Sequence, residues 1–194
     1  PVVCAVSGSG GCGKSTIVAT MAHAASLLGL RAAVLDLDLM FGNLYDLLGV
    51  DTRMTWRRLS SIGCGCTCRI GHRGRLDACC PGRHALGPGR RARTGRAHGA
   101  PVELLLDVLR RESDVVLVDT SVFWGDAVAA AVAASDRCLV VGDPSVSSAT
   151  STARVIELTS RVGVPRTRMS AVFNRFGARG ADEDVAMRLR LPAR

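Results

Sequence analysis

Short runs of apolar residues alternate along this chain with longer stretches in which apolar residues recur at helical spacing. Residues 2–6 form the first run and are followed by glycines, which is typical of a buried parallel strand. Residues 14–28 then predict a helix that stops at Gly29, and residues 31–35 predict a second buried strand. Residues 39–56 predict a loop with a short helix. Further strands are predicted at 114–119, 137–141 and 169–174, and further helices at 102–111, 127–134 and 147–162.

This alternation predicts an α/β fold, in which a doubly wound, mostly parallel sheet is covered by helices on both faces. The 194 residues suffice for one such domain and are few for two, so we expect a single domain over 1–194. The sequence has no run of about 18 apolar residues and no visible signal peptide, so we expect a cytoplasmic protein. Because the chain starts at Pro1, directly before a predicted strand, we expect a fragment that lacks an upstream domain.

The segment from about residue 60 to 100 does not fit this alternation. It has no apolar periodicity and is rich in Gly, Arg, Cys and His. Ten arginines and one acidic residue lie between Arg57 and Ala100, so this stretch alone accounts for the formal net charge of +8. We therefore interpret it as an irregular Arg/Cys-rich insertion, and outside it we do not expect nucleic-acid binding.

Three interpretations of this insertion remain open. A basic, disordered arm would bind nucleic acid. A stretch read in a shifted frame would explain why the compositional bias starts and stops abruptly, and we favour this interpretation. A zinc module is the third, although the C-x-C-x-C and C-C spacings differ from the usual C-x₂-C pairs of zinc ligands. Its candidate ligands are Cys64, Cys66, Cys68, His72, Cys79, Cys80 and His84.

A glycine-rich loop follows the first predicted strand and opens the first predicted helix. The pattern G-x-x-x-x-G-K-[ST] is met by Gly8, Gly13, Lys14 and Ser15. Glycines let the backbone fold tightly around phosphate with its N–H groups pointing inward, next to the positive end of the helix. Lys14, the only lysine of the chain, would reach the β- and γ-phosphates, and the Ser15 hydroxyl would bind Mg²⁺. The loop therefore predicts a phosphate-binding site.

Acidic residues follow two of the predicted strands at the point where each strand ends. Asp36 and Asp38 come after the strand at 31–35, and Asp119 ends the strand at 114–119. Ligands bind at the carboxyl edge of strands in open α/β sheets. We therefore expect these carboxylates to form the second half of the phosphate site.

Together these motifs resemble the deviant Walker A ATPases of the MinD/ParA superfamily. The loop reads G-G-C-G-K-S-T over 10–16, residues 36–44 are similar to the family's D-x-D…G-N-L switch, and residues 116–119 form the second acidic strand end. Residues 172–175 are similar to the family's N-R strand end, and 143–148 to its P-x-x-x-S stretch. The resemblance implies a P-loop NTPase fold with ATP and Mg²⁺ as ligands.

The resemblance also implies a role for each matching residue. Lys14 and Asp38 would be catalytic, the aspartate by orienting the attacking water, and Asn174 would hydrogen-bond adenine. Mg²⁺ would be held by Ser15, Asp36 and Asp119, the last of these through water. The loop residues that would bind the nucleotide are Gly10, Gly11, Cys12, Gly13, Lys14, Ser15 and Thr16.

One position departs from the family pattern. Ser9 stands where the family has a signature lysine that reaches the phosphates of a dimer partner. A hydroxyl cannot supply that positive charge, so we expect weak hydrolysis and leave a homodimer open. The branch that tolerates this loss comprises the TadZ/CpaE pilus-assembly localisation proteins and the related actinobacterial septum-site-determining proteins. Their receiver-like domain before the ATPase domain would explain a chain that begins at Pro1.

The resemblance thus implies a spatial regulator that binds ATP and acts on protein partners of a division or pilus apparatus. Two alternatives remain: a non-catalytic nucleotide-binding scaffold, or a ParA-like DNA-partition ATPase. The stretch 185–194 lacks the hydrophobic and basic amphipathic helix by which MinD binds membranes, so we expect no direct membrane insertion.

Overall fold

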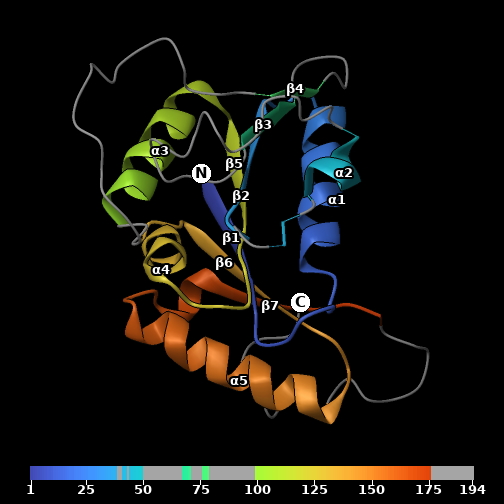
Figure 1. Cartoon of the computed structure of the whole chain (residues 1–194), viewed down its shortest axis with the longest axis vertical. Coiled ribbons are helices and arrows are strands. Elements are labelled where there is room, and N and C mark those ends of the chain that lie inside the picture. Colours follow the sequence, from blue (N-terminus) through green and yellow to red (C-terminus); the bar gives the residue numbers. More distant parts are fainter. Residues whose placement is uncertain (39–40, 43, 50–66, 71–75, 79–98, 176–194) are drawn as a thin grey trace.

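Seven strands form one sheet in the computed structural model, which describes residues 1–38, 41–42, 44–49, 67–70, 76–78 and 99–175 (Figure 1). The strands are β1 (Val2–Ser7), β2 (Ala32–Asp36), β3 (Thr67–Ile70), β4 (Leu76–Ala78), β5 (Val115–Asp119), β6 (Arg137–Gly142) and β7 (Met169–Phe173). The helices are α1 (Lys14–Leu27), α2 (Leu44–Leu48), α3 (Gly99–Glu112), α4 (Asp126–Ala133) and α5 (Val146–Arg161), with a 3₁₀ turn at Arg166–Arg168. Across the sheet the order is β4-β3-β2-β5-β1-β6-β7.

Five strands of this sheet are parallel, which confirms the predicted doubly wound, mostly parallel architecture. Every pairing from β2 through β5, β1 and β6 to β7 is parallel. Each of these strands lies within one or two residues of its predicted range, because buried parallel strands are continuous apolar runs that end at polar or glycine residues. The carboxyl ends of all five strands therefore meet at one edge of the sheet.

The strands β3 and β4 were not predicted, because their residues show no apolar alternation. β3 pairs antiparallel with β2, and β4 pairs antiparallel with β3, so both extend the sheet beyond the parallel part. A free sheet edge presents unpaired backbone N–H and C=O groups, which can pair with a further strand whatever its side chains are. Apart from residues 99–100, which begin α3, the rest of the insertion lies outside the described residues, including all its candidate zinc ligands except Cys68 of β3.

Apolar side chains on both faces of the sheet are buried under helices. Successive side chains of a strand point to opposite faces, so Cys4 and Val6 of β1 belong to one core and Ala5 to the other. The larger core lies under α3, α4 and α5, and the smaller one under α1 and α2 (Figure 1). In the described part of the chain, no helix is long and apolar enough to cross a lipid bilayer.

Helix α3 provides a test of this packing, because two of its leucines differ in burial. Leu106 is fully buried and Leu104 is 52% exposed. Leu106→Ala should lower the free energy of unfolding by about 2–5 kcal/mol, because it leaves a cavity under the helix. The matched control Leu104→Ala should change it by only about 0.5 kcal/mol. Urea denaturation of both variants measures the difference, and equal losses would contradict the placement of α3.

Candidate functional site

The glycine-rich loop connects β1 to α1 at the carboxyl edge of the sheet. Gly11 and Gly13 have φ angles of 75° and 91°, in the left-handed region that glycine adopts without strain. Gly13 is also the residue before the first turn of α1, and it has no side chain that would cap the N–H groups of that turn. A loop of this shape directs backbone N–H groups and the positive end of a helix toward an anion.

Neighbouring elements pack against two glycines of the loop and leave two others open. A Cβ atom on Gly8 would lie 2.3 Å from the carbonyl oxygen of Ser151 in α5. A Cβ atom on Gly13 would lie 2.1 Å from the Asn174 side-chain nitrogen. Around Gly10 and Gly11, by contrast, no described atom comes within 4 Å of such a Cβ. The loop is therefore backed by α5 and by the end of β7, and it opens at its two middle glycines.

Lys14 forms a buried ion pair with Asp119. The Nζ atom donates to Asp119 Oδ1 over 3.2 Å, and the two residues are only 8% and 1% exposed. Asp119 ends β5 and pairs in register with Ala5 of β1, so the strand pairing itself brings the carboxylate under the loop. Removing one partner of a buried pair leaves an unpaired buried charge, which is strongly destabilising. The pair thus places the chain's only lysine at the end of the loop.

Asp36 lies beside Asp119 and organises the segment that follows β2. The two aspartates pair in register across β2 and β5. Asp36 Oδ1 accepts from the Asp38 N–H over 2.9 Å, and Oδ2 accepts from the Leu44 N–H over 3.4 Å. The pKa of Asp36 is raised to about 6, chiefly by burial and further by the charges of Asp119 and Asp38, while both backbone hydrogen bonds act to lower it. A Cβ on Gly42 would lie 2.5 Å from Oδ2, so a glycine is needed where the segment folds back.

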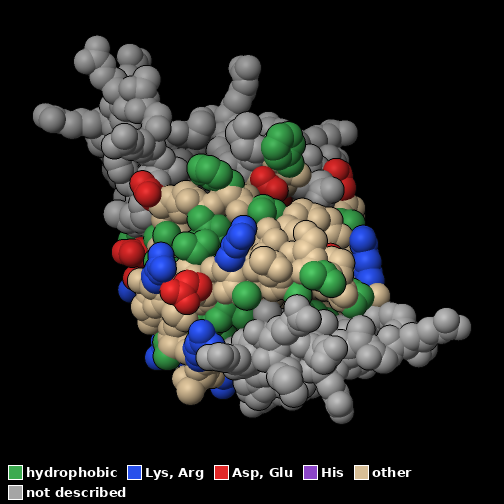
Figure 2. Space-filling model, turned by 90° about the horizontal axis from the view of Figure 1, so that it is seen from below, with side chains coloured by type: hydrophobic (Ala, Val, Ile, Leu, Met, Phe, Trp, Pro, Cys, Tyr) green, Lys and Arg blue, Asp and Glu red, His purple; other side chains and the backbone are tan. Residues whose placement is uncertain are grey.

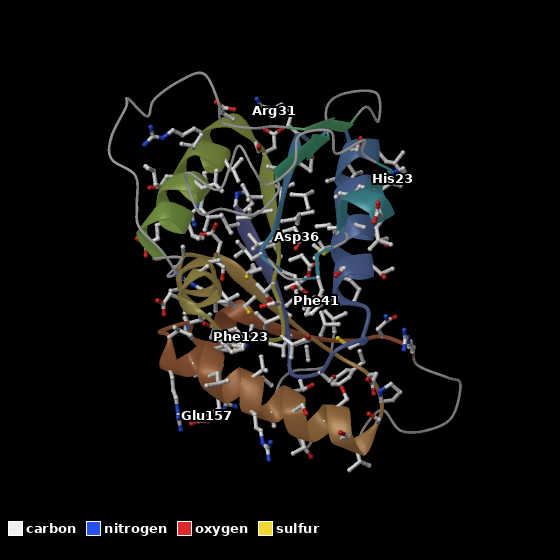
Figure 3. The ribbon with its side chains drawn as sticks, viewed as in Figure 1. His23, Arg31, Asp36, Phe41, Phe123 and Glu157 are labelled. Atoms are coloured by element: carbon white, nitrogen blue, oxygen red, sulfur yellow. The ribbon has the colours of Figure 1, made fainter. Side chains whose placement is uncertain are left out.

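Asp38 closes a turn at the start of the same segment. Its Oδ1 accepts from the Phe41 N–H over 3.1 Å, and its carbonyl oxygen accepts from the Gly42 N–H over 2.8 Å. Phe41 is 82% exposed, and Figure 3 shows it below Asp36 near the end of β2. Asp38 is therefore at the sheet edge where the sequence predicts it, and its carboxylate is engaged in the turn.

Asn174 lies next to the loop although 162 positions separate it from Cys12 in the sequence. Its side-chain nitrogen donates to the Cys12 carbonyl oxygen over 3.0 Å. Its backbone N–H donates to the Gly142 carbonyl over 2.9 Å, which continues the pairing of β7 with β6. The structure thus brings the residue with the implied adenine role onto the phosphate loop.

The turn before α5 is held by side-chain hydrogen bonds. Ser145 caps the helix, since its Oγ accepts from the Ser148 N–H over 3.1 Å, and Asp143 Oδ1 accepts from the Ser145 N–H over 2.9 Å. The side-chain and backbone hydrogen bonds of Ser145 lower the pKa of Asp143. This turn follows β6, so it lies at the same edge of the sheet as the loop.

The sequence analysis assigned no role to two residues that lie near the site. Thr120 is fully buried and its Oγ1 donates to the Ala5 carbonyl over 2.8 Å, which ties the segment after β5 to β1. Its position directly after Asp119 was the available signal. Ser151, which lies against Gly8, had none, because a serine in the middle of a helix is ordinary.

The residues at this edge fit a magnesium ion bound together with a phosphate. The Ser15 hydroxyl and the carboxylates of Asp36 and Asp119 are hard oxygen donors of the kind that Mg²⁺ prefers. Among the described residues, no group of three or more His, Cys, Asp or Glu side chains could hold a metal alone. Mg²⁺ commonly takes one or two protein oxygens and completes its shell with water and phosphate, so this donor set is sufficient.

Comparison with known families agrees with this geometry. The family model described as "CobQ/CobB/MinD/ParA nucleotide binding domain" matches residues 3–192. The chain belongs to this MinD/ParA family. The septum site-determining protein MinD of Thermotoga maritima is 24% identical over 90% of this chain and 64% of its own length. The chain spans between 58% and 68% of the length of the curated relatives that it matches.

Solved structures of MinD proteins share the fold of this family member. MinD of Pyrococcus horikoshii, solved in complex with Mg-ADP, has a TM-score of 0.73 at 19% identity, covering 99% of this chain and 78% of that one. The MinC:MinD cell division complex of Aquifex aeolicus has a TM-score of 0.72 at 21% identity, covering 99% of this chain and 78% of that one. Likeness at this level of identity shows the P-loop NTPase fold of the family.

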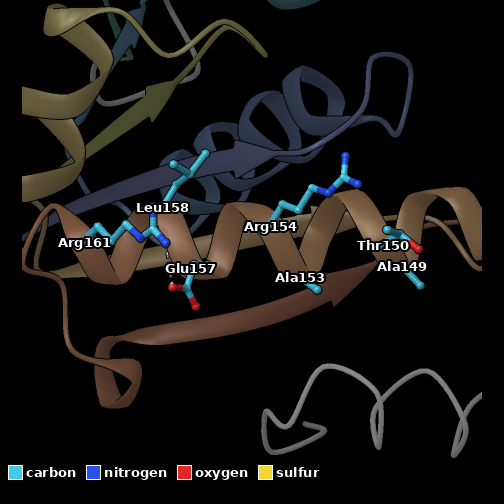
Figure 4. A pocket seen from close by; sticks show the side chains of 7 residues that line it. All are labelled: Ala149, Thr150, Ala153, Arg154, Glu157, Leu158 and Arg161. Carbon is cyan, nitrogen blue, oxygen red and sulfur yellow. Dashed lines mark hydrogen bonds and ion pairs between the residues drawn. The ribbon is translucent and has the colours of Figure 1, made fainter.

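A hollow along α5 is separate from this site. Figure 4 shows the side chains that line it, all from α5, and apolar, basic and acidic side chains mix on the face that Figure 2 shows. Its lining contains none of the predicted site residues, so we assign it no part in nucleotide binding. The residues that line it are Ala149, Thr150, Ala153, Arg154, Glu157, Leu158 and Arg161.

The raised pKa of Asp36 predicts a pH dependence of stability. An aspartate whose pKa is about 6 when folded, against a usual 3.8, binds its proton more tightly in the folded chain. Protonation of Asp36 therefore adds about 2–3 kcal/mol to the stability as the pH falls from about 7.5 to 4. The difference in free energy of unfolding between wild type and Asp36→Asn should shift by this amount in favour of wild type.

Urea denaturation across this pH range measures that shift. Asp46→Asn, at an exposed position of α2, is the matched control, and its difference from wild type should change much less. A wild-type advantage over Asp36→Asn that shrinks as the pH falls would show that Asp36 is stabilised in its charged form instead.

Proposed function

We propose that this chain binds ATP with Mg²⁺ and acts as a spatial regulator with weak ATP hydrolysis. The observation that carries this proposal is the buried Lys14–Asp119 pair at the end of a glycine loop with two left-handed glycines. Membership of the MinD/ParA family supports it, as does the Mg-ADP bound to the Pyrococcus MinD of similar fold. Gly10, Gly11, Cys12, Gly13, Lys14, Ser15 and Thr16 would form the nucleotide site.

Each side chain at this edge of the sheet would have a different role in binding ATP and Mg²⁺. The Lys14 ammonium has three N–H groups and gives one to Asp119, so it can contact phosphate oxygens while Asp119 holds it in place. Mg²⁺, when bound, neutralises charge on the phosphates, and Ser15 and Asp119 are the residues that would hold it, with Asp36 supporting the metal shell. Asp36 would support Asp119 and fix the segment that carries Asp38.

Weak hydrolysis follows from two features of the chain. Ser9 brings no positive charge to the loop. The Ser9 carbonyl oxygen accepts a hydrogen bond from the Ser7 hydroxyl over 3.1 Å. Asp38, which would orient the attacking water, is bound to the Phe41 N–H in the turn that it closes. Phosphoryl transfer depends on positioning and charge neutralisation, so both features limit the rate.

The proposed regulator is closest to the septum-site-determining and TadZ/CpaE pilus-localisation branch, working in the cytoplasm. The loop without a signature lysine and the D-L-D-L-M-F-G stretch after β2 support this branch. The MinD of Aquifex aeolicus is solved in complex with MinC, so a protein partner of a division apparatus is the partner class that we propose.

A second candidate function is a nucleotide-binding scaffold without catalysis. Ser9 favours it specifically, because the loop keeps its binding residues and lacks the family's additional cation. The two candidates share nucleotide binding and differ only in turnover.

Nucleotide binding should depend on Lys14. Lys14→Ala removes charge-assisted hydrogen bonds to phosphate and leaves Asp119 unpaired, so the Kd for Mg-ATP should rise about 10- to 100-fold. Isothermal titration calorimetry measures this change. Arg154→Ala removes an exposed cation on α5 and serves as the control, with an unchanged Kd. Equal affinities for wild type and Lys14→Ala would refute the proposed site.

Phosphate release separates the two candidate functions. At saturating ATP, wild type should release phosphate faster than Lys14→Ala, whereas equal rates beside intact ATP binding would establish the scaffold. Ser9→Lys restores a cation at the loop and should raise the rate about 10-fold or more if charge at this position limits turnover. A Ser9→Lys rate equal to wild type would show that another feature, such as the engaged Asp38, sets the rate.

A further inference from the structure

The side chain of Asn174 has a hydrogen-bond partner on each of its two polar atoms. Its Nδ2 donates to the Cys12 carbonyl over 3.0 Å, and its Oδ1 accepts from the Arg175 N–H over 2.9 Å. Reversing the amide would place oxygen against the Cys12 carbonyl and NH₂ against an N–H donor. The two bonds therefore fix the direction in which the amide points.

The backbone around Asn174 is held equally firmly. The Asn174 N–H is bound to the Gly142 carbonyl of β6, so the sheet sets the position of the residue. Arg175, which follows, has a φ of 62°, a left-handed conformation that is uncommon for a residue with a side chain. This conformation accompanies the hydrogen bond from its N–H back to Asn174 Oδ1. Asn174 is thus a rigid donor that the sheet presents to the loop.

The hydrogen bond to Cys12 determines how the next N–H group of the loop points. In a trans peptide, the C=O group and the following N–H point in opposite directions. The Cys12–Gly13 peptide is trans and its C=O faces Asn174, so the Gly13 N–H is directed away from Asn174. That N–H belongs to the residue before the first turn of α1, where backbone donors bind phosphate.

Gly13, the residue after Cys12, has no side chain that would clash with the Asn174 amide nitrogen. A Cβ atom on Gly13 would lie 2.1 Å from Asn174 Nδ2, well inside any real contact. A residue other than glycine would therefore push Asn174 away, in addition to the strain of a φ of 91°. The observed position of Asn174 therefore depends on a glycine at position 13.

We propose that Asn174 is a positioning residue of the phosphate-binding loop, which orients the Gly13 N–H toward the phosphates by holding the Cys12 carbonyl. This inference rests on the proposed nucleotide binding. It differs from the adenine contact that the family resemblance implies, because a loop-positioning residue acts on every phosphate ligand, whereas an adenine contact acts on ATP alone.

The test compares ligands that share phosphates and differ in the base. The Kd of the chain with Mg²⁺ is measured for ATP, for GTP and for inorganic tripolyphosphate, in wild type and Asn174→Ala. We expect all three Kd values to rise about 10-fold in the variant, equivalent to about 1.4 kcal/mol for each ligand. Arg168→Ala, at an exposed position just before β7, is the control and should change none of them.

The outcomes separate this inference from the proposed function. A loss confined to ATP, or unchanged values for all three ligands, would overturn the positioning role while leaving nucleotide binding intact. Absence of binding by the wild type to any of the three would overturn both. Thermal unfolding of Asn174→Ala without ligand shows whether the variant is folded.

A second measurement needs no variant. The chain contains two asparagines and no glutamine, so its NMR spectrum holds only two side-chain NH₂ pairs. Tripolyphosphate should shift the Gly13 backbone amide resonance, and the Asn174 NH₂ pair should keep the downfield position of a hydrogen-bonded amide with and without it. A Gly13 resonance that tripolyphosphate left unchanged would overturn the inference, because the Gly13 N–H would then not face the phosphates.

Discussion

The buried ion pair between Lys14 and Asp119 is the interaction on which the candidate site depends. Lys14 belongs to α1 and Asp119 to β5, so the pair joins the loop to a strand that lies more than 100 residues away. Each charge is buried, and each is tolerated because the other is present. Asp119 also pairs in register with Asp36, which places a second carboxylate beside the pair. The position of the loop, the lysine and both carboxylates is thus set by the register of β1, β5 and β2.

Three carboxylates lie close together at this edge of the sheet and repel one another. A bound cation would relieve this repulsion. Asp36, Asp38 and Asp119 lie close enough that the other two raise the pKa of Asp36. One lysine offsets only part of this negative charge. Such an arrangement is most favourable when a further cation is present, which agrees with a ligand that arrives with Mg²⁺.

Much of this fold and of the candidate site can be predicted from the sequence. The contacts that cannot be predicted depend on packing between distant parts of the chain or on backbone pairing. The five parallel strands are continuous apolar runs, and Asp36 and Asp119 end two of them, so strand order alone brings these residues together. The contacts of Gly8 with Ser151 and of Asn174 with Cys12 depend on how α5 and β7 pack, which no local pattern encodes. β3 and β4 form by backbone pairing at a free edge, and side-chain periodicity does not report on that.

The central place of β1 in the sheet has a consequence for the folding of the domain. β1 precedes the other described strands of the sheet, yet its two neighbours are β5 and β6, which follow it by more than 100 residues. Its partners therefore exist only once the chain has been synthesised as far as β6, and such long-range pairing is intrinsically slow. β1, which precedes the glycine loop, therefore stays unpaired until β5 and β6 have been synthesised. The ligand site is consequently absent from any folding intermediate that lacks β5 and β6, and nucleotide binding would report that the whole sheet has assembled.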